Sequence, residues 1–220
     1  MKLPPRLADG GVALLLGRDV EPGTDPHQVK GVAYRGHLDF IGSEMPGGLK
    51  AHREALEALP MVGSEQLREF FDQTFFASST YDVFPLAIAG IACARMTGET
   101  FMDFVVRRTR QQVDKDISGV HKFLIKIVSA KMVASRLPRL LTQYMNFTEV
   151  EVERPESDHV SAQIKGIPLA LGGWFLAVLD TYMRTVLKMA GATDATVESQ
   201  TVIDEDPNRA IIVLDVRFPS

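Results

Sequence analysis

Hydrophobic positions recur with a helical period through the first two-thirds of the chain, up to about residue 146. The segments predicted as helices are 48–59, a short stretch after Ser64, 85–96, a stretch after Thr100, and 120–137. Ser64 and Thr100 are expected as N-cap residues, Gly98 is expected to end the third helix, and Pro138 to end or kink the last. Residues 30–34 are predicted as a short strand.

The period of the hydrophobic pattern changes from 3.6 to 2 after Phe147. Alternating residues predict strands over 148–153, 160–165, 196–203 and 209–218, with one long helix over 171–190. Alternation of this kind gives a strand one buried and one wet face, as an antiparallel sheet allows. The sequence therefore predicts an α+β fold, in which a helical N-terminal two-thirds packs on a C-terminal four-stranded antiparallel sheet ordered strand–strand–helix–strand–strand.

Glycine and proline are frequent in the first 28 residues, where turns such as Glu21–Pro26 are expected. We interpret residues 1–28 as a flexible arm and residues 29–220 as a single α+β domain. No stretch approaches the ~20 apolar residues that a membrane-spanning helix needs. With one cysteine, no intrachain disulfide and no export signal in view, a cytoplasmic location is expected.

Several strings of residues accompany this layout and carry a resemblance to a known family. They are KGVAY at 30–34, FPLAIA at 84–89, GWFLAVLD at 173–180, AGA at 190–192 and IIVLDVRF at 211–218. With this order of elements, the chain resembles a family of uncharacterised proteins found chiefly in myxobacteria. The resemblance spans roughly residues 28–218 and includes no diagnostic catalytic string.

The order of elements is also similar, more distantly, to the superfamily that holds 4-vinyl-reductase domains, haem–nitric-oxide sensors and vesicle-tethering TRAPP subunits. This resemblance implies that helices and sheet enclose an apolar ligand or acyl chain, or build a dimer surface. The Tyr-x-Ser-x-Arg haem-contact motif is absent, which argues against haem. The clustered cysteines of many 4-vinyl-reductase domains are absent too, which argues against a cysteine-ligated metal.

No phosphate-binding loop, nucleophile elbow or zinc-binding helix motif is present, so no catalytic residue is predicted. The histidines are scattered without ligand spacing, and Cys93 lies in an apolar run that should keep its thiol buried and protonated. We therefore predict no metal site and leave the cofactor unknown. The pairs His37–Asp39 and Asp158–His159 are interpreted as solvated loop residues, and Glu149, Glu151 and Glu153 as one wet sheet face facing Lys165.

Charge is unevenly distributed, although the net charge is only −4. Residues 105–140 carry nine basic against two acidic groups, and residues 148–206 carry eleven acidic against four basic groups. Pairing between these segments, a protein partner or second copy, and another anion all stay open as explanations. The negative overall charge and the absence of a binding motif disfavour nucleic acid.

The leading hypothesis is a non-catalytic cytoplasmic sensor or interaction domain, which binds a small apolar ligand or a protein partner as a homodimer. The residues expected to bind the ligand are Phe101, Phe104, Phe123, Trp174 and Tyr182. The alternatives are an unrecognised enzyme, or a module that binds an acidic protein, nucleotide or nucleic acid through a basic helical face. That face is expected to comprise Arg107, Arg108, Arg110 and Lys122.

Overall fold

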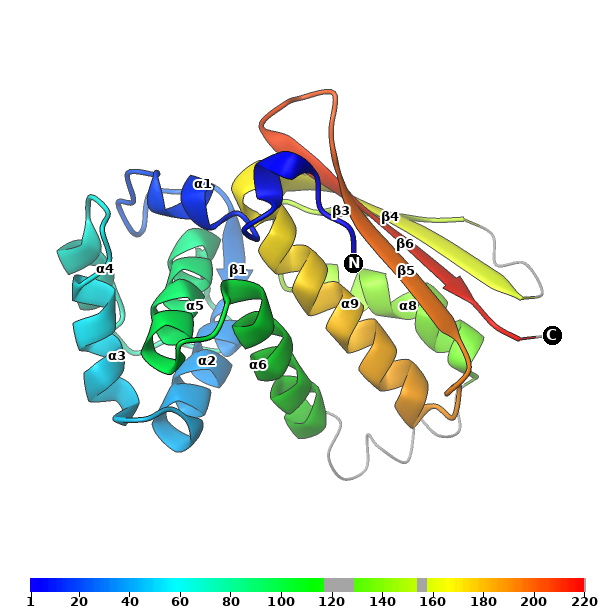
Figure 1. Cartoon of the computed structure of the whole chain (residues 1–220), viewed down its shortest axis with the longest axis horizontal. Helices are drawn as coiled ribbons and strands as arrows, with labels where there is room; N and C mark the ends of the chain where they lie inside the picture. Colours follow the sequence, from blue (N-terminus) through cyan, green and yellow to red (C-terminus); the bar gives the residue numbers. More distant parts are fainter. Residues whose placement is uncertain (117–128, 154–157, 220) are drawn as a thin grey trace.

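A computed structural model describes residues 1–116, 129–153 and 158–219 of the chain. The N-terminal part is mainly helical and lies to one side of the molecule (Figure 1). Its elements are η1 (Pro5–Leu7), α1 (Val12–Leu16), β1 (Gln28–Lys30), α2 (Gly31–Glu44), α3 (Gly48–Glu57), α4 (Ser64–Phe70), β2 (Thr80–Asp82), α5 (Val83–Thr97) and α6 (Phe101–Asp116). Helix α5 is buried along nearly its whole length and forms the centre of this part.

The C-terminal part contains a four-stranded antiparallel sheet in the order β3-β4-β6-β5. Its elements are α8 (Ala130–Thr142), β3 (Glu149–Val152), β4 (His159–Pro168), η2 (Leu169–Leu171), α9 (Gly172–Met189), β5 (Thr196–Ile203) and β6 (Arg209–Arg217). The strand–strand–helix–strand–strand order and the α+β class predicted from the sequence are confirmed. The predicted pairing of Lys165 across the strands is also confirmed, because its Nζ lies 2.7 Å from Glu151 Oε2.

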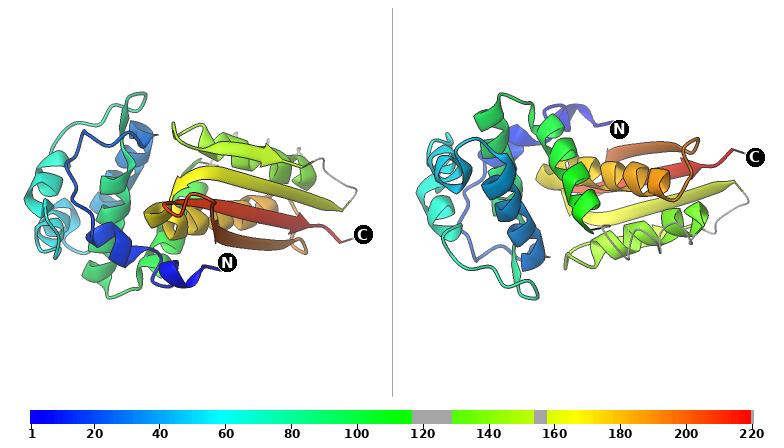
Figure 2. Two further views of the ribbon diagram at one scale, coloured as in Figure 1. Left: turned by 90° about the horizontal axis from the view of Figure 1, so that it is seen from above. Right: turned by 90° about the horizontal axis from the view of Figure 1, so that it is seen from below.

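Helices α8 and α9 cover one face of the sheet (Figure 2). Buried side chains from α8, α9 and the strands form a hydrophobic cluster there, including Met183, Leu187, Leu214 and Val216. The buried face that alternation predicts for the last strand is therefore confirmed at Leu214 and Val216. Among the described residues, no helix combines the length and apolarity needed to cross a bilayer.

The segment predicted as a strand at 30–34 is helical, and this prediction was wrong. Only Lys30 belongs to the short strand β1, which pairs with β2, and α2 begins at Gly31. The backbone at Gly31 passes so close to the carbonyl of Phe76 that a Cβ there would lie 2.2 Å from its oxygen. The close approach of the 76–82 segment thus requires glycine where the chain turns from strand into helix.

Two helix ends agree with the sequence signals, one differs, and the proline expected to end or kink the last helix lies within it. Gly98 ends α5 in the left-handed conformation at φ 70°, and the Thr100 hydroxyl accepts a hydrogen bond from the Asp103 amide at 3.1 Å. Ser64 is the first residue of α4 rather than its N-cap, which is Gly63. Pro138 lies inside α8, so of the two effects expected of it, an end or a kink, the end does not occur.

Residues 1–28 pack on the rest of the chain at several points. Leu7 and Leu15 are fully buried in the main hydrophobic cluster. Lys2 lies beside β5, where its amide donates to the Ser199 carbonyl at 2.8 Å and its carbonyl accepts from the Thr201 amide at 2.9 Å. These contacts join the start of the chain to the edge of the sheet.

Candidate functional site

A cavity of about 500 Å³ lies where the helical part meets the helices that cover the sheet. Its wall comes from β1, α2, α5, α6, α8 and α9, and most of it is apolar. Well-packed interiors contain few voids larger than a water molecule, whereas ligand pockets span roughly 300–1,000 Å³. Val32, Leu140 and Tyr144 belong to the wall and are also exposed, so the cavity reaches the surface there.

Polar side chains gather on the α6 side of the cavity. Arg108, Thr109 and Gln112 belong to the wall, and a Cβ at Gly36 would lie 3.2 Å from Arg108 Nη2 and 2.7 Å from Gln112 Oε1. Because residue 36 is glycine, the side chains of Arg108 and Gln112 can pack directly against α2. We call this side of the cavity its polar end. The remaining wall is mostly apolar and includes Val178 and Leu179 of α9. A ligand with an apolar body and a polar or anionic head would match this distribution of wall residues.

The aromatic residues expected to bind a ligand have different positions. Phe104, Trp174 and Tyr182 lie in the cavity wall. Phe101 is buried in the hydrophobic core beside Gly90 and is not part of the wall. Phe123 lies outside the described residues. Helical spacing places an aromatic side chain on an inward face, but it does not distinguish a cavity wall from solid core.

The basic residues singled out on α6 do not share one exposed face. Arg107 is half-buried and forms two hydrogen bonds with Glu99, at 2.9 and 3.1 Å. Arg108 lies in the cavity wall, while Arg110 is exposed. Lys122 lies outside the described residues. Of the residues expected on one basic helical face, Arg107 and Arg108 are thus only partly exposed, and Arg110 is exposed.

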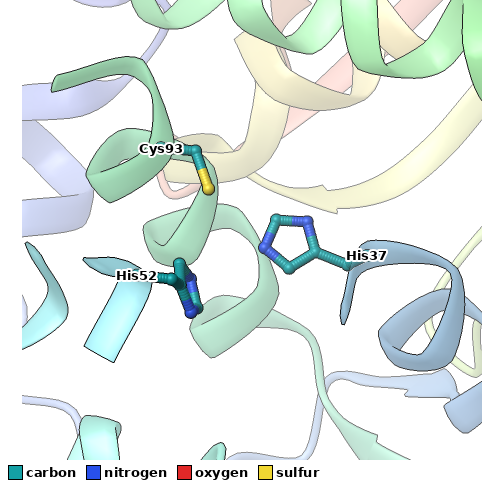
Figure 3. Close-up of side chains that lie close together, drawn as sticks. All are labelled: His37, His52 and Cys93. Atoms are coloured by element: carbon teal, nitrogen blue, oxygen red, sulfur yellow. The ribbon is translucent and has the colours of Figure 1, made fainter. Parts of the chain in front are cut away.

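A second cluster lies beside the cavity, where α2, α3 and α5 meet. His37, His52 and Cys93 come from these three helices, and one potential ligand atom of each lies within 4.8 Å of the other two (Figure 3). All three side chains are buried. In the part of the chain that the structure describes, neither His37 Nε2 nor His52 Nε2 has a hydrogen-bond partner. Each such buried nitrogen costs about 1–3 kcal/mol of folding free energy.

The surroundings keep the three groups uncharged. Burial lowers the pKa of His52 to about 4, with a smaller contribution from the charge of Arg53. Burial also lowers the pKa of His37 well below its usual value, assisted by His52 and Arg108. Burial raises the pKa of the Cys93 thiol to about 12, partly offset by Arg107 and Arg108. At neutral pH the cluster is therefore two neutral imidazoles and a thiol.

The prediction that His37 is a solvated loop residue was wrong, because it occupies the buried face of α2. The other pair is also arranged differently, since His159 Nε2 lies 2.9 Å from Asp215 Oδ1 across the sheet. A signal for the cluster was present in the sequence. His37 follows Tyr34 by three positions and precedes Ile41 by four, and His52 precedes Leu56 by four, so both occupy core positions of a helix.

Comparisons with solved structures identify H-NOX domains as similar folds. The chain superposes on an H-NOX protein from K. algicida in its Fe(II) unliganded state with a TM-score of 0.53 and 12% identity, over 86% of this chain and 97% of that one. An oxygen-binding H-NOX domain related to soluble guanylate cyclases gives 0.58 and 11%, over 87% and 95%. A structure solved to probe haem distortion in the H-NOX family gives the same values.

At these identities the likeness shows a shared fold and nothing further. The sequence matches no known protein-family profile. It also matches no curated protein sequence.

The haem named for that family can be tested against the residues present. A histidine that ligates haem iron must present a ring nitrogen to the macrocycle. His37 is the histidine among the described wall residues, but its Nε2 is shielded and its ring edge points toward His52 and Cys93 (Figure 3). Among the residues that the structure describes, no wall histidine is therefore placed to ligate a haem iron in this cavity.

Proposed function

We propose that this protein is a sensor domain that binds a small amphiphilic molecule, with an apolar body and one anionic or strongly polar head. The observation that carries the proposal is the cavity of about 500 Å³, apolar over most of its wall and polar at Arg108, Thr109 and Gln112. The apolar body would lie against Phe104, Trp174 and Val178. An anionic head would meet the Arg108 guanidinium, whose charge-assisted hydrogen bonds are stronger than neutral ones.

Two further points support a binding role over catalysis. The cavity wall places no nucleophile beside a general base among the residues that the structure describes. The same fold serves, in an H-NOX structure, to bind oxygen. The fold thus binds a ligand in that structure, and the wall of the cavity in this protein suits a different ligand, an amphiphile with a polar or anionic head.

Trp174 makes the proposal directly measurable, because it is the only tryptophan of the chain and lies in the cavity wall. The probe is 1-anilinonaphthalene-8-sulfonate, which combines aromatic rings with one sulfonate. We expect saturable binding of one probe per chain, with the fluorescence of Trp174 quenched by energy transfer. Failure to saturate at one equivalent would contradict the proposal.

Blocking variants separate the cavity from nonspecific apolar binding. Ala33→Phe places a large ring at the cavity wall, whereas Ser43→Phe adds the same ring at an exposed position of the same helix. We expect Ala33→Phe to abolish binding and Ser43→Phe to leave it unchanged. Equal affinities in the two variants would show that the probe binds elsewhere.

A substitution of Arg108 tests whether the polar end of the cavity binds the anionic head of a ligand. Arg108→Met keeps an unbranched apolar stem but removes the guanidinium. We expect it to weaken binding of the sulfonated probe about tenfold or more, which corresponds to the ~1.5–3 kcal/mol typical of a hydrogen bond to a charged group. Binding of the neutral analogue N-phenyl-1-naphthylamine should change little. A parallel loss for both probes would mean that Arg108 supports the cavity without contacting an anionic head.

A further inference from the structure

We propose that His37, His52 and Cys93 form a buried metal site for monovalent copper, separate from the ligand cavity but adjoining it. Thiolate and imidazole are donors that suit copper and zinc. The three side chains converge from α2, α3 and α5, with ligand atoms within 4.8 Å of one another (Figure 3). A set of one sulfur and two nitrogens is the trigonal set that proteins use for copper.

The shielded imidazole nitrogens are the second observation that points to a ligand. His37 and His52 are almost completely buried, and within the described ranges their Nε2 atoms have no hydrogen-bond partner. Buried polar atoms are nearly always satisfied, so two unsatisfied imidazole nitrogens in a cluster with one thiol require an explanation. A shared cation satisfies both at once. The edge of Phe71 packs against His52, with ring centroids 5.4 Å apart, and keeps the surroundings apolar.

The three ligand atoms need to move only a short distance to bind one ion. Donor atoms bound ~2.0–2.3 Å from an ion, as thiolate and imidazole are, lie roughly 3.5–4 Å from each other in a trigonal arrangement. A separation of at most 4.8 Å therefore has to shorten by about 1 Å. Side-chain rotation can supply this without movement of the helices.

Charge selects monovalent copper over zinc. Loading replaces the thiol proton of Cys93: Cu⁺ bonds to the sulfur, and the proton leaves to solvent, with no change of oxidation state. The resulting Cu⁺–thiolate unit is neutral, whereas Zn²⁺ would leave one net positive charge in an apolar interior. The positive charges of Arg107 and Arg108 act on Cys93 and would oppose that further charge. His37 belongs to the cavity wall as well, which gives the ion a path inward.

The test uses the full chain under anaerobic, reducing conditions, with Cu⁺ buffered by bicinchoninate. We expect one Cu⁺ per chain, a rise in the thermal unfolding midpoint, and X-ray absorption that shows one sulfur and two nitrogen neighbours. Cys93→Ser and His52→Gln should each lower the affinity at least a hundredfold. His27→Gln is the matched control, because His27 lies outside the cluster and pairs with Asp25.

Several outcomes would overturn the site. One is that wild-type protein fails to compete with bicinchoninate for Cu⁺. Another is that Cys93→Ser or His52→Gln leaves the affinity for Cu⁺ unchanged. X-ray absorption of copper-loaded wild-type protein that does not show one sulfur and two nitrogen neighbours also overturns the site. This measurement needs no variant, so the test does not depend on whether the variants fold. Stoichiometric Zn²⁺ binding in preference to Cu⁺ would overturn the choice of ion. None of these results depends on whether the cavity binds an amphiphile.

Discussion

At the scale of single residues, Asp180 shows how a buried charge is held in this fold. The carboxylate lies on α9 against the sheet and is buried. It accepts hydrogen bonds from Arg184 at 2.8 and 3.1 Å and from the Ser199 hydroxyl at 2.6 Å. Arg184 also donates to the Val197 carbonyl of β5. This network joins helix to strand and compensates the cost of removing the carboxylate from water.

Asp180→Asn should therefore destabilise the protein. The amide retains the shape but weakens the charge-assisted bonds and leaves Arg184 without its anion, at a cost of about 1–3 kcal/mol in the free energy of unfolding. Urea unfolding at neutral pH measures the change. Asp194→Asn, at an exposed position, is the control and should stay within about 0.5 kcal/mol of wild type. A loss of similar size in both variants would contradict the role of the network.

His37 and His52 predict a pH dependence of stability in metal-free protein. Burial lowers the pKa of both, and that of His52 to about 4, whereas unfolded histidine has a pKa near 6.5. The unfolded state thus binds more protons below pH ~6.5. The free energy of unfolding is therefore highest above that pH. It falls as the pH drops toward 4, by up to about 1.4 kcal/mol per pH unit for each histidine.

Urea unfolding between pH 7.5 and 5, with chelator present, measures this slope. His52→Gln should reduce the slope by the share of one histidine. Gln66→Ala, at an exposed position of α4, is the control and should retain the wild-type slope. Identical slopes for wild type and His52→Gln would show that this imidazole is not held neutral by the fold.

At the scale of elements, the N-terminal segment makes a prediction that distinguishes a loose arm from a packed one. Leu7 and Leu15 are fully buried, so Leu7→Ala and Leu15→Ala should each cost about 2–4 kcal/mol in the free energy of unfolding. The measurement is denaturant unfolding. Leu49→Ala, at an exposed position of α3, is the control. Variants at 7 and 15 that unfold like wild type would support the flexible arm expected from the sequence.

The C-terminal elements could be predicted from sequence almost to the residue. The strand expected at 196–203 matches β5, because β-branched residues are frequent in it and Asp204–Asn208 gives a turn signal. Helix α2 could not be predicted so easily, since Gly31, Gly36 and Gly42 weaken its helical signal. At Pro138 the local rule allowed an end or a kink, and α8 continues past this residue to Thr142, with Ala134 and Leu137 buried.

At the scale of the whole molecule, the cavity depends on how distant helices fit together. The sequence indicated inward-facing aromatic side chains, but Phe104 lines the void and Phe101, one turn earlier, fills the core. The histidine–cysteine cluster likewise requires three helices to converge. Neither outcome follows from spacing along one element, which is why the candidate site could be predicted only in part.

The most direct test of the central claim is native mass spectrometry of the protein as purified, with Ala33→Phe purified alongside. The account predicts that wild type carries an additional mass of a small organic molecule, which is lost on denaturation and absent from Ala33→Phe. The Ser43→Phe control should carry the same mass as wild type. A wild-type protein that is free of ligand, and that takes up no 1-anilinonaphthalene-8-sulfonate in the same experiment, would contradict a ligand-binding cavity.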